Sequence, residues 1–139
     1  MKTASSAAEM SHAVRAKVGA VIVKDNNILA YGYNGTPAGF DNTCENYHTM
    51  IKNDGTRIIE LSTKPEVLHA ESNSISKVAR STNSAEGATL YVTLSPCLEC
   101  AKLIIQAGIK KVVYKETYRD TSSITLLEKC NVEVIQVER

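Results

Sequence analysis

The sequence of 139 residues has a formal net charge of +1, with 43% hydrophobic and 22% charged residues, a composition typical of one globular domain. The near-neutral charge argues against a large contact with polymeric nucleic acid, but it is compatible with a small phosphorylated ligand. No apolar run approaches the ~20 residues that span a bilayer, and the start of the sequence does not resemble a signal peptide. The spacing of the four cysteines does not suggest a disulfide framework. We therefore expect one cytosolic domain over residues 1–139 with no membrane partner.

The first part of the chain predicts a helix followed by two paired strands. The Ala-rich residues 2–15 are typical of a helix packed on a sheet. The near-continuous apolar run 18–23 predicts a strand that is buried on both faces. A turn at residues 25–27, where Asn tolerates positive φ, would return the chain as a second strand over residues 28–33.

A long polar connection follows. The Gly/Pro-rich residues 34–39 form a loop at a strand end, where ligand-binding loops often lie, although an ordinary turn is the commoner explanation. We expect a short helix near residues 45–52, and then an irregular surface loop as far as residue 66.

The second half predicts helices that alternate with strands. Helices are expected over residues 67–80, 97–107 and 122–129, and strands over residues 88–94, 112–114 and 132–137. Gly108 would end the second of these helices. The element order predicts an α/β fold, a three-layer αβα sandwich in which a mixed five-stranded sheet has helices on both faces.

Two short motifs carry the chemistry, His69-Ala70-Glu71 and Pro96-Cys97-Leu98-Glu99-Cys100. Zinc binds nitrogen and sulfur ligands, and a catalytic zinc keeps one of its four positions open for water. His69, Cys97 and Cys100 would supply three ligands for one zinc ion per chain. Glu71 would then be the catalytic acid/base beside the water.

The spacing of these residues has a structural reason. Cys97 and Cys100 are three residues apart and share a face of a helix, which Pro96 is well suited to open. A helix N-terminus favours thiolates and so aids metal binding. His69 and Glu71 are only two residues apart, so they can converge only if His69 lies at the very start of its helix.

Each motif alone has another explanation. A single CxxC at a strand–helix junction also suits a thioredoxin-like redox pair, and HxE alone is uninformative. Together they form the known H-x-E…P-C-x-x-C signature of zinc-dependent base deaminases. The combination favours a catalytic zinc over a redox pair or a purely structural site.

From its motifs, loop and element order, the whole chain resembles the cytidine deaminase superfamily, and within it the deoxycytidylate (dCMP) deaminases. The matching segments are residues 15–20, 32–37, 69–71, 91–100 and 106–111. The Asn-Gly-x-Pro loop within them is more specific to this branch than either zinc motif.

The resemblance implies hydrolysis of dCMP to dUMP and ammonia, a step of pyrimidine deoxynucleotide metabolism that supplies dUMP for dTMP synthesis. Zinc-bound hydroxide would attack cytosine C4, and Glu71 would carry protons to N3 and then to the departing amino group. A related enzyme that accepts dCTP is the nearest alternative.

The resemblance also implies how the nucleoside is held. Asn34 would clamp the ribose and base, and backbone groups of Ala70 and of the segment from Thr93 to Ser95 would read the pyrimidine edge. Tyr118 would stack on the base, although a rim or core tyrosine is nearly as common.

Arg15 and Lys17 are our candidates for the 5′-phosphate, because a guanidinium group suits bidentate contact with phosphate. A solvated surface cation is an equally ordinary role for each.

Members of the family are often homohexamers, activated by dCTP with Mg²⁺ and inhibited by dTTP. Lys77 and Arg80 are the candidate effector contacts here, although Lys77 stands where an apolar residue is expected. Some members hold a second, structural zinc. His12, Cys44 and His48 supply too few ligands for it, so no such site is predicted.

Two other functions remain open at this point. A tRNA adenosine deaminase shares both motifs, but the long segment between Asn34 and His69, the Asn-Gly-Thr-Pro loop and the near-neutral charge argue against it. The other is a zinc-stabilised binding module without catalysis. Glu71 counts against that reading, because a structural site normally has four protein ligands and needs no free carboxylate.

Overall fold

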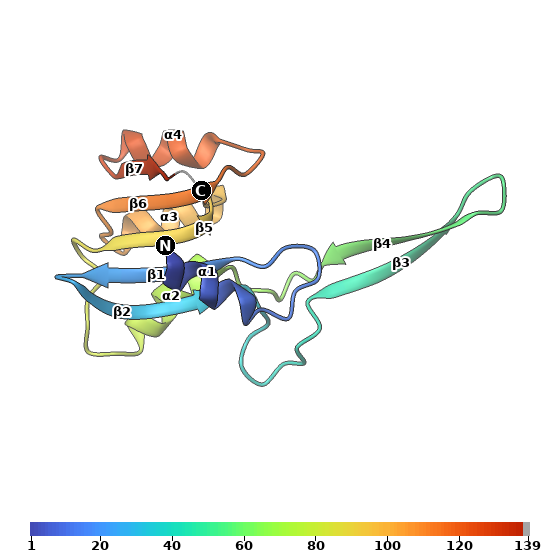
Figure 1. Ribbon diagram of the computed structural model, residues 1–139, viewed down its shortest axis with the longest axis horizontal. Coiled ribbons are helices and arrows are strands. Elements are labelled where there is room, and N and C mark those ends of the chain that lie inside the picture. Colours follow the sequence, from blue (N-terminus) through green and yellow to red (C-terminus); the bar gives the residue numbers. More distant parts are fainter. Residues whose placement is uncertain (138–139) are drawn as a thin grey trace.

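The computed structural model describes residues 1–137 and contains a five-stranded sheet with the strand order β2-β1-β5-β6-β7 (Figure 1). Antiparallel pairing joins β1 to β2 and to β5, whereas β5, β6 and β7 run parallel. The sheet is therefore mixed, as predicted. Its strands are β1 (Gly19–Lys24), β2 (Asn27–Tyr33), β5 (Thr89–Leu94), β6 (Lys111–Glu116) and β7 (Glu133–Gln136).

Helices cover both faces of this sheet, which confirms the predicted sandwich. They are α1 (Lys2–Glu9), α2 (Ala70–Ala79), α3 (Leu98–Gln106) and α4 (Ser122–Lys129). Gly19 of β1 faces α1, where a Cβ would collide with the backbone of Ala4, and Gly32 of β2 faces α2, where a Cβ would lie 2.7 Å from the carbonyl oxygen of Ala70. Because Gly32 pairs with the residue after Gly19, the two glycines point to opposite faces.

The main hydrophobic core lies between the sheet and the layer of α2, α3 and α4. Leu90 and Val112 of the sheet are fully buried there with Ile104 of α3 and Leu127 of α4. In β5-α3-β6 and β6-α4-β7 a helix connects two neighbouring parallel strands, the usual way in which such strands are joined.

The predicted turn between the first two strands is confirmed. Asp25 and Asn26 have φ values of 52° and 62°, and β2 begins directly after them. Positive φ at both central residues is the geometry of a type I′ hairpin turn, which matches the twist of the paired strands.

The first helix is shorter than predicted, since α1 ends at Glu9 and not near residue 15. Side chains provide the hydrogen-bond acceptors beyond its end. The Ala13 N–H donates to Ser11 Oγ at 3.1 Å, and the Val14 N–H donates to a carboxylate oxygen of Glu45 at 2.9 Å. Such bonds compete with helical hydrogen bonds, so this segment continues as a loop.

The helix predicted near residues 45–52 is wrong. β3 (Glu45–Ile51) and β4 (Arg57–Thr63) pair antiparallel as a separate two-stranded ribbon, which occupies most of the predicted irregular loop. Gly55, with φ of 85°, lies in its turn. We call this ribbon the arm, and it projects away from the body of the molecule (Figure 1).

The remaining element boundaries differ from the prediction by a few residues at most. The largest shift is at α2, which begins at Ala70 and not at residue 67. Among residues 1–137, no helix is long and apolar enough to cross a membrane. The predicted single domain extends to residue 139, and its last two residues lie outside the described part of the chain.

Candidate active site

The N-termini of two helices bring together the side chains of the two predicted motifs. His69 precedes α2 as its N-cap, with the extended backbone angles φ −78° and ψ 160°, and Cys97 is the N-cap of α3. The Sγ atoms of Cys97 and Cys100 lie 3.3 and 3.4 Å from His69 Nδ1. The position of His69 confirms the expectation that the HxE motif opens a helix.

Local structure explains the position of the two thiols. Pro96 and the extended Cys97 end the segment after β5, and Cys100 lies one turn into α3. The Cys100 N–H points at Cys97 Sγ at 3.4 Å, as in an N-cap. Both sulfur atoms are therefore near the positive end of the helix dipole.

The donor atoms fit a zinc ion. The ligand atoms of His69, Cys97 and Cys100 lie within 4.8 Å of one another, and one nitrogen and two sulfur atoms are a set that zinc prefers. Within residues 1–137 this is the only group of three or more histidine, cysteine or acidic side chains arranged in this way. With three protein ligands, such a site leaves a fourth position open.

The three donor side chains differ in how readily they lose a proton. Hydrogen bonds from Cys100 and His69 lower the pKa of Cys97 to about 4, whereas the bond to Cys97 and burial raise the pKa of Cys100. The bond to Cys97 also raises the pKa of His69, against the effect of burial. The low pKa favours the thiolate of Cys97, whereas protons on Cys100 and His69 must be displaced when a metal ion binds.

Glu71 lies beside this group in the first turn of α2 and is only 3% exposed. Burial raises the pKa of its carboxyl group to about 7, because an apolar environment disfavours the charged form. A cation at the donor group has the opposite effect and favours the carboxylate. Glu71 is therefore a titratable group that lies next to the three donor side chains without being needed as a ligand.

A cavity of about 260 Å³ contains these groups and most of the predicted substrate contacts. His69, Glu71 and Cys97 line it, and Arg15, Asn34, Ala70, Ser95 and Tyr118 do so as well. These residues come from segments far apart in the sequence. The size suits a single small ligand.

Asn34 holds the loop before β1 in place. Its Oδ1 accepts a hydrogen bond from the Val18 N–H at 2.9 Å, and its Nδ2 donates to the Ala16 carbonyl at 2.8 Å. The amide keeps one lone pair and one hydrogen for a ligand. Asn34 therefore combines a structural role with a position in the cavity wall.

Ser95 and Tyr118 are connected to each other. The Tyr118 N–H donates to Ser95 Oγ, which ties the segment after β6 to the end of β5. Tyr118 remains 40% exposed at the cavity. Its ring is thus placed at a rim where it can contact a ligand.

Four predicted contacts lie outside the cavity wall. Thr93 Oγ1 accepts a hydrogen bond from the Gly19 N–H at 3.1 Å, and neither Thr93 nor Lys17 lines the cavity. Lys77 and Arg80, at the other end of α2, do not line it either. The Lys77 ammonium donates to the Tyr31 carbonyl and lies 4.3 Å from the centre of its ring.

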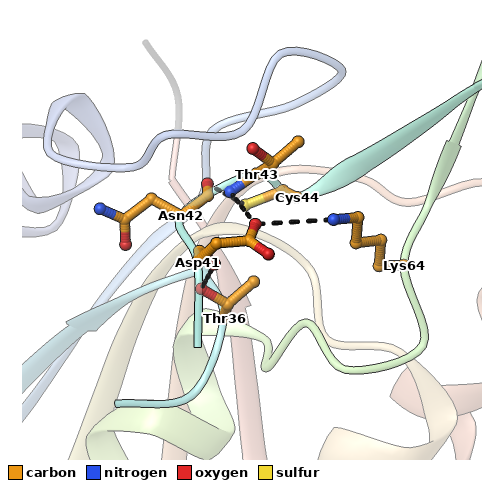
Figure 2. A network of polar contacts seen from close by, with 6 residues as sticks. All are labelled: Thr36, Asp41, Asn42, Thr43, Cys44 and Lys64. Atoms are coloured by element: carbon orange, nitrogen blue, oxygen red, sulfur yellow. Dashed lines mark hydrogen bonds and ion pairs between the residues drawn. The ribbon is translucent and has the colours of Figure 1, made fainter. Parts of the chain in front are cut away.

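The base of the arm contributes two residues to the cavity wall that no sequence motif indicates. Glu45 and Thr63, which face each other across its base, line the cavity. Figure 2 shows how the neighbouring loop is attached to this base: the Asp41 carboxylate accepts from the Thr43 N–H at 2.9 Å and lies 3.6 Å from Lys64 Nζ. The sequence predicts a helix at Glu45, and no pattern there marks this residue as part of the site.

Comparison with known proteins identifies the family. Residues 1–116 match the family described as the cytidine and deoxycytidylate deaminase zinc-binding region. The chain belongs to this family. The resemblance inferred from the motifs is confirmed, and the zinc-binding character of the family agrees with the donor set of the cavity.

Two curated deaminases show the extent of the similarity. Deoxycytidylate deaminase of Enterobacteria phage T2 is 40% identical over 88% of this chain and 82% of the relative. The human deoxycytidylate deaminase is 39% identical over 90% of this chain and 67% of the relative.

The structural similarity extends over nearly the whole chain. The crystal structure of dCMP deaminase from the cyanophage S-TIM5, in complex with dCMP and dUMP, covers 98% of this chain and 92% of its own with a TM-score of 0.85 and 46% identity. The similarity therefore extends beyond residues 1–116, which match the family's zinc-binding region.

Proposed function

We propose that this protein is a zinc-dependent hydrolase that converts dCMP to dUMP and ammonia. The observation that carries the proposal is the convergence of the donor atoms of His69, Cys97 and Cys100 at a cavity whose wall includes the buried Glu71. Its similarity to deaminases named for dCMP, one of them described with dCMP and dUMP, supports this substrate.

In this proposal, His69, Cys97 and Cys100 hold the zinc ion. Zinc bound by three protein ligands lowers the pKa of a water molecule and so supplies a nucleophile near neutral pH. Water adds at C4 of cytosine, the bond from C4 to the amino nitrogen breaks, and the products are a C4 carbonyl and ammonia.

Glu71 moves the protons. Its carboxylate takes a proton from the attacking water and delivers it to N3, and then transfers the proton of the new C4 hydroxyl to the amino nitrogen, which leaves as ammonia. Its position in the first turn of α2, two residues from His69, brings it near the metal ligands and within the same cavity. Burial excludes bulk water from this group, which is 3% exposed.

The walls of the cavity would bind the remainder of the nucleotide. Arg15 is the candidate for the 5′-phosphate, and Asn34 and Tyr118 for the sugar and base. Ser95 and Ala70 contribute the nearby backbone. Lys17 and Thr93 lie outside the wall, so the geometry gives less support to their predicted contacts with the substrate.

We also propose that the protein forms homo-oligomers, with the hexamer of the family as the expected state. The exposed apolar side chains of the arm support association: Tyr47, Met50, Ile51 and Ile59 are between 51% and 71% exposed. Isolated two-stranded ribbons are marginally stable in water, so burial of this surface would stabilise the arm. Ile59→Lys should shift the mass measured by light scattering toward smaller species.

Regulation by dCTP with Mg²⁺ and by dTTP stays a prediction. Lys77 is held against Tyr31, so Arg80 is the cation with more freedom to meet a triphosphate. An increase in activity on addition of dCTP, which Arg80→Ala removes, would support this role.

A deamination assay tests the function directly. Ammonia release should be fast with dCMP, slower with dCTP and deoxycytidine, and absent with a tRNA anticodon stem-loop. Formation of inosine in that stem-loop would favour the tRNA adenosine deaminase alternative. Zinc binding with no turnover of any of these substrates would favour a non-catalytic module.

A further inference from the structure

A buried carboxylate at the cavity has no role in the proposed reaction. Glu45 is only 3% exposed, although the other six residues of β3 are exposed. Burial of a carboxylate is costly unless hydrogen bonds compensate for the loss of water. The bonds that Glu45 makes therefore indicate what this residue does.

Both hydrogen bonds of the Glu45 side chain go to the loop between α1 and β1. Its Oε2 atom accepts from the Val14 N–H at 2.9 Å and from the Arg15 N–H at 3.1 Å. Hydrogen bonds to a charged acceptor are stronger than neutral ones. Two consecutive N–H groups directed at one oxygen restrict the backbone at Arg15, and with it the direction in which the side chain leaves the chain.

The residue opposite Glu45 contacts the guanidinium group of the same arginine. Thr63 pairs with Glu45 at the base of the arm, and Arg15 Nη1 donates to Thr63 Oγ1 at 3.3 Å. One pair of the arm thus holds both the backbone and the end of the Arg15 side chain. All three residues line the cavity.

A backbone hydrogen bond joins the two ends of the arm at its base, and an ion pair links that base to the loop after β2. The Lys64 N–H donates to the Cys44 carbonyl at 2.8 Å, and the Lys64 ammonium pairs with Asp41 of the loop after β2 (Figure 2). Glu45 and Thr63 lie directly beside Cys44 and Lys64 in the sequence. Glu45 and Thr63 thus lie at the end of the arm where its two strands are joined to each other and to the loop after β2.

From this geometry we infer that Glu45, together with Thr63, is a positioning residue that holds Arg15 toward the phosphate of the substrate and so sets the preference for a nucleotide over a nucleoside. This inference rests on the proposed function, in which Arg15 binds the 5′-phosphate. A carboxylate repels phosphate, so Glu45 acts through Arg15 and not by contact with the phosphate. A preorganised cation loses less freedom when the ligand binds.

The test compares kcat/KM for dCMP and for deoxycytidine in the zinc-loaded enzyme. Glu45→Ala should lower kcat/KM for dCMP about tenfold, mainly through KM, and change the value for deoxycytidine by less than about twofold. Glu45→Gln keeps an oxygen that can accept the same two N–H groups, and should retain most of the preference. Glu60→Ala, an exposed carboxylate in β4, is the matched control and should match wild type.

A double variant shows whether Glu45 acts through Arg15. In the Arg15→Ala background, Glu45→Ala should have little further effect on the ratio of the two kcat/KM values, because the group that it positions is gone. If the single variant Glu45→Ala is unstable, Thr63→Val, which removes the acceptor of Arg15 Nη1 at similar volume, should lower the preference in the same direction.

Two results would overturn this inference and leave the proposed function intact. One is a wild-type enzyme that prefers dCMP while Glu45→Ala and Thr63→Val keep the full preference. The other is an equal loss for both substrates in Glu45→Ala, which would make Glu45 a contact of the nucleoside or a purely structural residue. Wild-type protein that deaminates neither compound would instead overturn the proposed function, and this inference with it.

Discussion

The substitution Gly32→Ala tests whether the contact between β2 and the first turn of α2 positions the catalytic residues. A Cβ at residue 32 would lie 2.7 Å from the Ala70 carbonyl oxygen and 2.8 Å from the Ser74 nitrogen. Both are backbone atoms of α2, so no side-chain rotation relieves the overlap. Ala70 lies between His69 and Glu71, and any displacement therefore moves the metal ligand and the proton carrier.

The size of the effect follows from these distances. An ordinary van der Waals contact needs about 3.4 Å, so strand and helix must separate by about 0.7 Å. Overpacking of this kind costs about 1–3 kcal/mol of the free energy of unfolding, or roughly 3–10 °C in Tm. A misplacement of about 1 Å at a catalytic group costs on the order of 100-fold in rate.

Thermal unfolding and the kcat for dCMP provide the two readouts for Gly32→Ala. Gly35→Ala is the matched control, because a Cβ there meets no atom within 4 Å. We expect Gly32→Ala to lose at least tenfold in kcat while Gly35→Ala keeps the wild-type Tm. A Gly32→Ala enzyme with unchanged Tm and kcat would refute the argument that close approach of β2 sets the position of α2.

Three further substitutions separate the roles within the site. Cys100→Ala should lose both zinc and activity, measured by metal analysis and ammonia release, whereas Cys130→Ala, an exposed thiol, should keep both. Glu71→Gln should keep zinc and fold but lose about 100-fold or more in kcat, and retained turnover would assign the proton transfer to another group. Arg15→Ala should lower kcat/KM for dCMP and so reduce the ratio of kcat/KM for dCMP to kcat/KM for deoxycytidine. An unchanged ratio would show that Arg15 does not bind the phosphate.

Much of the fold could be predicted because its elements depend on local signals. The strand at residues 18–23 is marked by a continuous apolar run, and Asp25 and Asn26 adopt the positive φ expected of the hairpin turn. Gly108, with φ of 81°, follows the end of α3 as expected. The donor residues were identifiable for a similar reason, since the chemistry of zinc restricts both their type and their spacing.

The arm was mispredicted although a signal was present. Asn53-Asp54-Gly55 is a turn sequence flanked by Met50-Ile51 and Ile58-Ile59, a pattern typical of a hairpin. The polar residues around it favoured a helix and loop in the prediction, because strands that bury no face lack the usual alternation.

The role of Glu45 could not be predicted from local sequence. Its partners are Val14 and Arg15, 31 and 30 residues away, and the bonds exist only because the base of the arm folds against the loop after α1. The same contact, together with the local bond from the Ala13 N–H to Ser11 Oγ, holds the segment after α1 as a loop where the sequence predicts more helix. Propensity and periodicity describe neighbours along the chain and carry no information about such contacts.

We attribute the deamination of dCMP to one zinc ion held by His69, Cys97 and Cys100. Titration of zinc into metal-free protein, with the rate of dCMP deamination measured at each addition, tests it most directly. We predict a linear rise to a plateau at one equivalent of zinc per chain, and no rise in Cys97→Ala. Full activity in the metal-free protein, or a Cys97→Ala variant that reaches the same plateau, would contradict the account.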